Sequence, residues 1–257
     1  MPRRSTAWRH AEVAARAAAT EGGGSHSDDK PDILAPMNTH PFESVIVDTG
    51  ENPKTCVIWL HGLGADGHDF EPIVPEMQLP PGKPVRFIFP HAPVRRVTIN
   101  NGMPMRAWYD FRELAPGEGE DHGQVGEGVA AVQTLLAEAR RHYDTVLLGG
   151  FSQGGAMALL TGLVEGPAPD AVFGLSTYLP DAAKAGLQLS PRAAGLPIFM
   201  GHGSFDPVIP PDFGRHTSQA LRAMGVTLQW HEYPMPHSVC PDEIRDLSRW
   251  MGPLIQA

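Results

Sequence analysis

The chain has 257 residues, of which 42% are hydrophobic and 19% charged, and its formal net charge is −9. This composition is typical of a globular protein that is long enough to bury a full core, as one large domain or two small ones. The negative charge, with no basic stripe to offset it, argues against a nucleic-acid-binding surface.

Cysteine content and hydropathy bear on the compartment. The chain has two cysteines, Cys56 and Cys240, too few for a disulfide framework. Cys56 lies in an apolar run and is expected to be a small buried hydrophobe. No apolar run approaches the roughly 20 residues of a membrane span. We therefore expect a reducing, cytoplasmic compartment and no stable membrane insertion.

Residues 1–36 differ from the rest of the chain. Four arginines lie among alanines, and residues 22–31 have the glycine- and serine-rich composition of a linker. Three interpretations compete: a disordered tail, an organelle presequence, or translation from a start codon upstream of Met37. We favour a disordered or artefactual extension, followed by a folded domain over residues 37–257.

From Phe42 onward, strand-like and helix-like segments alternate. Strands are predicted at 44–48, 55–60, 85–89, 145–148, 171–175, 196–200 and 226–233. Helices are predicted at 126–143, from 153 to near 166, at 211–224 and at 241–254. This alternation predicts an α/β fold in one domain, with a mostly parallel sheet that helices cover on both faces.

The motif Gly150-Phe151-Ser152-Gln153-Gly154 lies between a predicted buried strand and a predicted helix. A serine nucleophile needs such a tight, strained turn at the end of a sheet, and the helix start directs N–H groups toward developing negative charge. A glycine-rich turn that only packs a helix onto a sheet is the alternative. The strand–turn–helix setting favours Ser152 as a nucleophile.

A serine hydroxyl needs a base, usually a histidine on a loop beyond the carboxyl ends of parallel strands. Of the twelve histidines, His237 lies between the last predicted strand and the last predicted helix, where such a loop is expected. Others lie within predicted elements or before glycine turns that they are expected to brace: His142, His216, His231, His61 and His202.

Two aspartates compete to orient that histidine. Asp206 follows the predicted strand 196–200, in a loop that Pro207 and Pro210 stiffen. Asp181 follows the strand 171–175, and a capping or turn role explains it equally well. Asp206 is favoured, and the resulting order, serine, aspartate, histidine, is the one that α/β-hydrolases use.

Two backbone N–H groups are expected to stabilise an oxyanion. One belongs to Gln153, directly after the nucleophile, and the other to the loop after an early strand. The strand 55–60 runs into the glycine-rich segment 61–68, and we nominate the N–H of Leu63.

No pattern indicates a metal or a cofactor. The chain has no H-E-x-x-H motif and no C-x-x-C pair, and the glycines near residue 117 do not follow a strand as a dinucleotide site requires. The segment 108–110, Trp-Tyr-Asp, is compatible with an acyl pocket and equally with plain core.

Several motifs together resemble one family, that of carboxylesterases and acyl-protein thioesterases, also called the phospholipase/carboxylesterase group. They cover nearly all of the chain after residue 37, in the order of that family. They are His61-Gly-Leu-Gly, Phe89-Pro-His-Ala-Pro, Arg106-Ala-Trp-Tyr-Asp, Gly150-Phe-Ser-Gln-Gly-Gly, His202-Gly-x-x-Asp-Pro-Val and Tyr233-Pro-Met-x-His-Ser-Val.

The resemblance implies a compact α/β-hydrolase without a large cap domain or a cofactor. It also implies cleavage of carboxylic esters or thioesters with short to medium acyl chains. By the resemblance, the residues of this chain that match the family's functional positions are the triad Ser152, Asp206 and His237, the oxyanion donors Leu63 and Gln153, and Trp108 and Val208 near the acyl group.

Two features depart from the family pattern. Pro236 precedes His237, where the family usually has glycine, and proline fixes φ and removes an N–H. The segment 140–145 is shorter than usual, and the extension 1–36 has no counterpart.

We therefore expect a serine hydrolase that cleaves carboxylic esters through an acyl-enzyme. Its substrate is expected to be a small ester or thioester, and the protein a monomer or homodimer. An acyl-protein thioesterase or a lysophospholipase is the alternative, because the same triad serves all three. A non-catalytic binding protein on the same fold is a more remote one.

Overall fold

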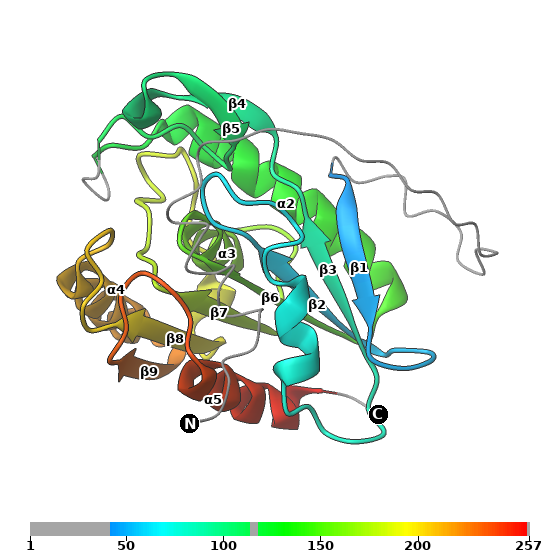
Figure 1. Ribbon diagram of the computed structural model, residues 1–257. Coiled ribbons are helices and arrows are strands. Elements are labelled where there is room, and N and C mark those ends of the chain that lie inside the picture. The colour runs from blue at the N-terminus through cyan, green and yellow to red at the C-terminus, as the bar shows by residue number, and fades with distance from the viewer. Residues whose placement is uncertain (1–41, 114–117, 256–257) are drawn as a thin grey trace.

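A computed structural model describes residues 42–113 and 118–255 (Figure 1). The predicted extension, residues 1–36, and the predicted start of the domain at Met37 lie outside these residues.

A seven-stranded sheet forms the centre of the part of the chain that the structure describes, in the order β1-β3-β2-β6-β7-β8-β9. Every neighbouring pair is parallel except β1 and β3. The predicted α/β fold with a mostly parallel sheet is thus confirmed. The strands are β1 Ser44–Asp48, β2 Thr55–Leu60, β3 Val85–Pro90, β6 Thr145–Phe151, β7 Ala171–Leu175, β8 Pro197–Gly203 and β9 Thr227–Tyr233.

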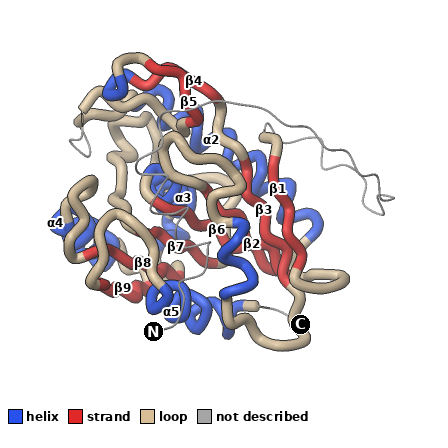
Figure 2. Tube along the Cα trace, viewed as in Figure 1, coloured by secondary structure: helices blue, strands red, loops and turns tan. Residues whose placement is uncertain are grey.

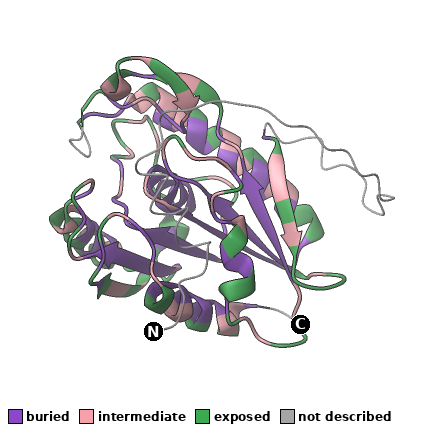
Figure 3. Ribbon diagram, in the orientation of Figure 1, coloured by how far each residue is buried: buried purple, intermediate pink, exposed green. Residues whose placement is uncertain are grey.

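The central strands are buried on both faces, which explains their continuous apolar sequence. In β2, Val57 and Trp59 face one hydrophobic cluster, whereas Ile58 and Leu60 face the other. The middle of the sheet is accordingly buried along its length, and the exposed residues lie at its periphery (Figure 3).

Helices cover both faces of the sheet (Figures 1 and 2). On one face lie α2 His122–His142, α3 Gln153–Leu163 and α4 Pro211–Ala223, and on the other α5 Pro241–Met251 and the 3-10 helix η1 Glu71–Glu76. Shorter 3-10 helices are η2 Thr98–Asn100, η3 Pro191–Ala193 and η4 Gly252–Leu254. Within residues 42–113 and 118–255, no helix combines the length and the apolar character that crossing a membrane requires.

Local signals set the helix ends. The Asp121 side chain accepts a hydrogen bond from the N–H of Gln124 and so caps α2, which begins four residues before the predicted start at 126. Two arginines and a histidine lie in the last turn of α2, where positive charge interacts favourably with the negative end of the helix dipole. Pro241 begins α5 at the first helical position, where its missing N–H costs nothing.

A second, two-stranded sheet was not predicted. Its antiparallel strands are β4 Val94–Val97 and β5 Met103–Arg106, and Arg95 of β4 bonds Gln124 near the start of α2. Both strands are only four residues long and carry arginines or a proline in place of an alternating apolar pattern. The signal on which strand prediction depends is therefore absent.

One ionisable side chain is wholly enclosed where α5 crosses the sheet. Glu243, in the first turn of α5, has no exposed surface, and a methyl group added at Gly201 of β8 would overlap its carboxyl group. Burial raises the pKa of Glu243 well above its ordinary range, and the nearby backbone N–H of Cys240 offsets only part of this. Burial therefore favours the protonated form of Glu243 in the folded chain.

This burial predicts a pH-dependent stability. In the unfolded chain a glutamate titrates near pH ~4.3. Because the folded pKa is higher, the contribution of Glu243 to the free energy of unfolding is complete below about pH 4.3 and is lost as the pH rises toward the folded value. Glu243→Gln keeps the shape and cannot ionise. The melting temperature of this variant, relative to that of the unmodified chain, should therefore increase from pH 4.5 to pH 8. The corresponding gain in the free energy of unfolding is at most about 1.4 kcal/mol per pH unit.

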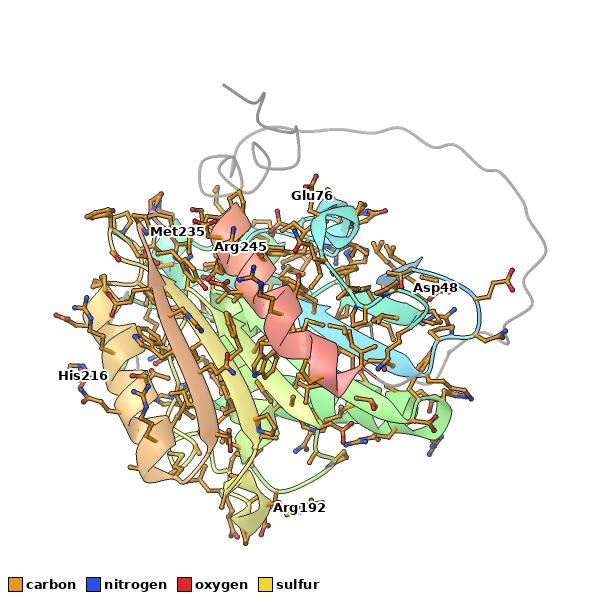
Figure 4. The ribbon with its side chains drawn as sticks, turned by 90° about the horizontal axis from the view of Figure 1, so that it is seen from below. Asp48, Glu76, Arg192, His216, Met235 and Arg245 are labelled. Atoms are coloured by element: carbon orange, nitrogen blue, oxygen red, sulfur yellow. The ribbon has the colours of Figure 1, made fainter. Side chains whose placement is uncertain are left out.

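The matched control is Glu76→Gln, which alters an exposed glutamate on η1 (Figure 4) and should show no such trend. A melting-temperature difference for Glu243→Gln that stays constant over this range would show that Glu243 is ionised in the fold.

Candidate active site

Ser152 occupies the turn between β6 and α3, with φ 55° and ψ −121°. Few residues other than glycine adopt a positive φ, and such a turn projects the side chain away from the sheet. Its N–H donates to Leu175 O at 2.9 Å, and its carbonyl accepts from Thr177 Oγ1 at 2.7 Å. Both partners lie at or just beyond the end of β7, so the neighbouring strand holds the serine backbone in this conformation.

Two glycines allow the close approach that this turn requires. A methyl group added at Gly154 would overlap the carbonyl oxygens of Leu60 and His61, and one at Gly150 would lie 2.7 Å from Leu60 O. Side chains at these positions would push α3 away from the end of β2. The G-x-S-x-G spacing is therefore a packing requirement of the turn.

The structure brings Ser152, His237 and Asp206 into one hydrogen-bonded chain. His237 Nε2 lies 2.9 Å from Ser152 Oγ, and His237 Nδ1 lies 2.7 Å from Asp206 Oδ2. A carboxylate accepts only, so Nδ1 carries the proton and Nε2 is free to accept from the serine hydroxyl. The three residues follow β6, β8 and β9, whose carboxyl ends meet at one edge of the sheet.

Asp206 is held in place by its own loop. Its Oδ1 accepts from the N–H groups of Val208 and Ile209 at 2.8 and 2.9 Å, and the residue is buried. His202 Nε2 is 3.6 Å from Asp206 Oδ2 but donates to Ile209 O at 2.9 Å. Burial lowers the pKa of His202, which favours the neutral ring and so limits its competition with His237 for the carboxylate charge.

Phe151 packs against the His237 ring, with ring centroids 4.8 Å apart. This contact could not be predicted from the motif, because the second position of G-x-S-x-G accepts any residue. Both hydrogen bonds of His237 lie in the plane of its ring. The Phe151 contact therefore restricts movements of the ring that these bonds do not control. A large side chain at that position was the only available signal.

Leu63 and Gln153 belong to two segments that meet at Ser152. Leu63 follows β2, and the Cα of the preceding Gly62 is so close to the turn that an added methyl group would lie 3.4 Å from Ser152 Cβ. Gln153 is the first residue of α3. Within the described part of the chain, neither backbone N–H has a hydrogen-bond acceptor. Both donors are therefore available to an oxyanion at Ser152.

Trp108 and Val208 occupy different environments. Trp108 is 1% exposed; its indole N–H donates to His61 O at 2.8 Å and its backbone N–H to Gln153 Oε1 at 2.9 Å. Val208 is half-buried and packs at the margin of the core cluster. In this structure Trp108 presents almost no surface to a ligand, whereas Val208 does.

The other candidates from the sequence lie away from Ser152 or make structural contacts. Asp181 Oδ1 accepts from the N–H groups of Ala183 and Lys184 at 2.9 and 3.1 Å, as a turn-capping carboxylate does. His142 lies in α2 and His231 in β9, and His216 projects from the outer side of α4 (Figure 4). Among the described residues, no three His, Cys, Asp or Glu side chains are grouped as a metal would require.

Comparisons with known proteins identify the family. The family model described as phospholipase/carboxylesterase matches residues 42–254. An acyl-protein thioesterase 1 of Mycosarcoma maydis is 35% identical over 228 residues, which is 81% of this chain and 95% of that protein.

Solved structures share the fold. The crystal structure of Zea mays acyl-protein thioesterase 2 superimposes with a TM-score of 0.69 at 27% identity, over 82% of this chain and 97% of that one. A Bacillus cereus carboxylesterase matches with a TM-score of 0.65 at 20% identity, over 82% and 93% of the two chains, and this likeness concerns the fold alone. The family resemblance inferred from the motifs is confirmed: the chain belongs to the phospholipase/carboxylesterase family and is an ester hydrolase with the α/β-hydrolase fold.

Proposed function

We propose that Ser152, His237 and Asp206 are the catalytic triad of this hydrolase. It cleaves carboxylic esters with short to medium acyl chains through an acyl-enzyme, and residues 37–257 form its single catalytic domain. The observation that carries this proposal is the continuous hydrogen-bonded chain from Ser152 Oγ through the His237 ring to Asp206.

Acylation follows from the protonation states in that chain. Nε2 of His237 accepts the Ser152 proton as Oγ attacks the substrate carbonyl carbon. The imidazolium that forms is stabilised by the buried Asp206 carboxylate at 2.7 Å. The N–H groups of Leu63 and Gln153 donate to the oxyanion, and the N-terminus of α3 adds a favourable dipole.

Collapse of the tetrahedral intermediate expels the leaving group. His237 donates its proton to the departing oxygen or sulfur, and the acyl group stays on Ser152 Oγ. The same ring then removes a proton from water, which attacks the acyl-enzyme and releases the acid. No step needs a cofactor.

Thioesters are the second candidate substrates, and a specific observation favours them. The relative from Mycosarcoma maydis and the structure from Zea mays are both acyl-protein thioesterases. Because the triad chemistry is the same for oxygen and sulfur leaving groups, a panel of oxyesters and thioesters of graded chain length distinguishes the two. A kcat/KM at least about tenfold higher for thioesters of equal acyl length would assign the chain to that class.

The second prediction concerns the nucleophile. Ser152→Ala should lower esterase activity by at least about 10³-fold and abolish labelling by a fluorophosphonate probe, because the attacking oxygen is removed. The matched control, Ser204→Ala on the loop that carries Asp206, should be labelled normally. Substantial turnover by folded Ser152→Ala would refute the nucleophile. Absence of labelling in the unmodified chain would instead favour a non-catalytic binding protein.

The third prediction concerns the acid. Asp206→Asn keeps the shape but removes the charge that stabilises the imidazolium, a change that costs about 10⁴ in kcat in a serine protease. A loss of at least about 10² is expected here. Asp181→Asn should change kcat less than about threefold, because a turn-capping role tolerates the amide. Both variants are assayed at saturating ester after circular dichroism confirms folding, and the reverse result would identify Asp181 as the acid.

A further inference from the structure

His61 is a buried histidine directly after β2, on the loop that carries Leu63, and the proposed chemistry does not use it. Its Nδ1 lies 2.8 Å from Gly62 O, and its Nε2 lies 3.0 Å from the backbone N of Ala92. A carbonyl only accepts and a backbone N–H only donates. The imidazole is therefore neutral, with its proton on Nδ1, and it ties this loop to the chain just after β3.

The bond to Gly62 O also orients the next N–H group. Gly62 C=O and Leu63 N–H belong to one peptide unit, which is planar and trans, so the two groups point in opposite directions. Fixing the carbonyl on the His61 ring thus fixes the direction of the Leu63 N–H. That N–H has no acceptor within residues 42–113 and 118–255, and Gly62 packs against Ser152.

Trp108 holds the preceding peptide and connects the two oxyanion donors. Its indole N–H bonds His61 O, and its backbone N–H bonds the Gln153 side chain. Gln153 Nε2 in turn donates to Tyr109 O at 2.8 Å. The peptides before and after Gly62 are therefore each held by a buried ring, and the Gln153 side chain is anchored to the backbone of Trp108 and Tyr109.

We propose that His61 is a positioning residue for the oxyanion hole: its Nδ1–H holds the Gly62 carbonyl so that the Leu63 N–H points at the oxyanion that forms when Ser152 attacks. This inference rests on the proposed function, since it presupposes the nucleophile. His61 does not touch the substrate and acts through the Gly62–Leu63 peptide.

The ring keeps this role over the working pH range. Burial lowers the pKa of His61 to about 4, and the electrostatic interactions with His91 and Arg106 act in the same direction, whereas the Gly62 hydrogen bond and Asp66 oppose it. His61 is thus neutral above about pH 5, and its contribution to the rate is independent of pH there.

Two substitutions separate the two hydrogen bonds. The amide nitrogen of His61→Asn falls near the position of Nδ1 and retains the donor to Gly62 O. The amide oxygen of His61→Gln falls near Nε2 and retains only the acceptor for Ala92. Removing one oxyanion donor costs about 10²–10³ in kcat, so misdirecting one in His61→Gln should cost about 10- to 100-fold with KM little changed. His61→Asn should stay within about threefold of the unmodified chain.

The affinity for a transition-state analogue tests whether His61 acts on the oxyanion hole, because a purely structural role would leave this affinity unchanged. A boronic acid that adds to Ser152 as a tetrahedral anion should bind His61→Gln more weakly, by the same factor as the loss in kcat/KM. The ratio of kcat/KM between the unmodified chain and His61→Gln should be constant from pH 5 to 9. A ratio that changes with pH would mean that His61 titrates, and would overturn the proposal.

Folding is controlled by melting temperature. If His61 only ties the loop down, activity will follow melting temperature and His61→Asn will be as impaired as His61→Gln, which refutes the proposal. Should His61→Gln not fold, Trp108→Phe tests the positioning of the same loop through its preceding peptide, because it keeps a ring but removes the donor to His61 O. It should show the same loss of kcat and boronate affinity, and unchanged values would refute the proposal that these hydrogen bonds position the Leu63 N–H.

Fluorophosphonate labelling distinguishes failure of this inference from failure of the proposed function. If the unmodified chain is not labelled at Ser152, the proposed function fails and the inference with it. If the unmodified chain is labelled and folded His61→Gln is labelled equally fast, only the inference fails.

Discussion

The left-handed backbone of Ser152 is the constraint on which the site depends. Holding a residue other than glycine in such a region costs on the order of 1–3 kcal/mol, and the surrounding structure supplies it. Hydrogen bonds from the end of β7 fix the serine backbone on one side. On the other side, Gly150 and Gly154 let α3 begin against the end of β2. Ser152, the start of α3 and the loop that carries Leu63 therefore share one contact region.

The remaining groups depend on the parallel sheet. Because β6, β8 and β9 run in the same direction, the loops after them meet. Ser152 and Asp206, which lie 85 and 31 residues before His237 in the sequence, therefore contact its ring. Each loop is then stiffened locally: Asp206 by two backbone N–H groups, and His237 by the Phe151 ring. Pro236, the departure from the family pattern, is exposed and leaves the histidine within reach of both partners.

How far the sequence predicts this structure depends on the kind of signal. β2 and β7 match their predicted ranges to the residue, because short apolar runs have clear limits. β8 extends three residues past its predicted end, since Gly201-His202-Gly203 has the composition of a turn but pairs with β9. The residues proposed as nucleophile, acid and base were found from motif and position alone. Contacts between distant loops, such as those of Phe151 and Thr177, leave no pattern in the chain.

The eleven residues of α3 are all buried, whereas β9 is an edge strand with exposed positions along its length. Segments with few buried contacts open locally at low free energy, while fully enclosed ones open only with the whole domain. Amide exchange should therefore be slowest around Ser152 and faster in β9 and the loop that follows it. Ser152 therefore lies beside an element that should open only with the whole domain, whereas His237 follows a strand that should open more readily.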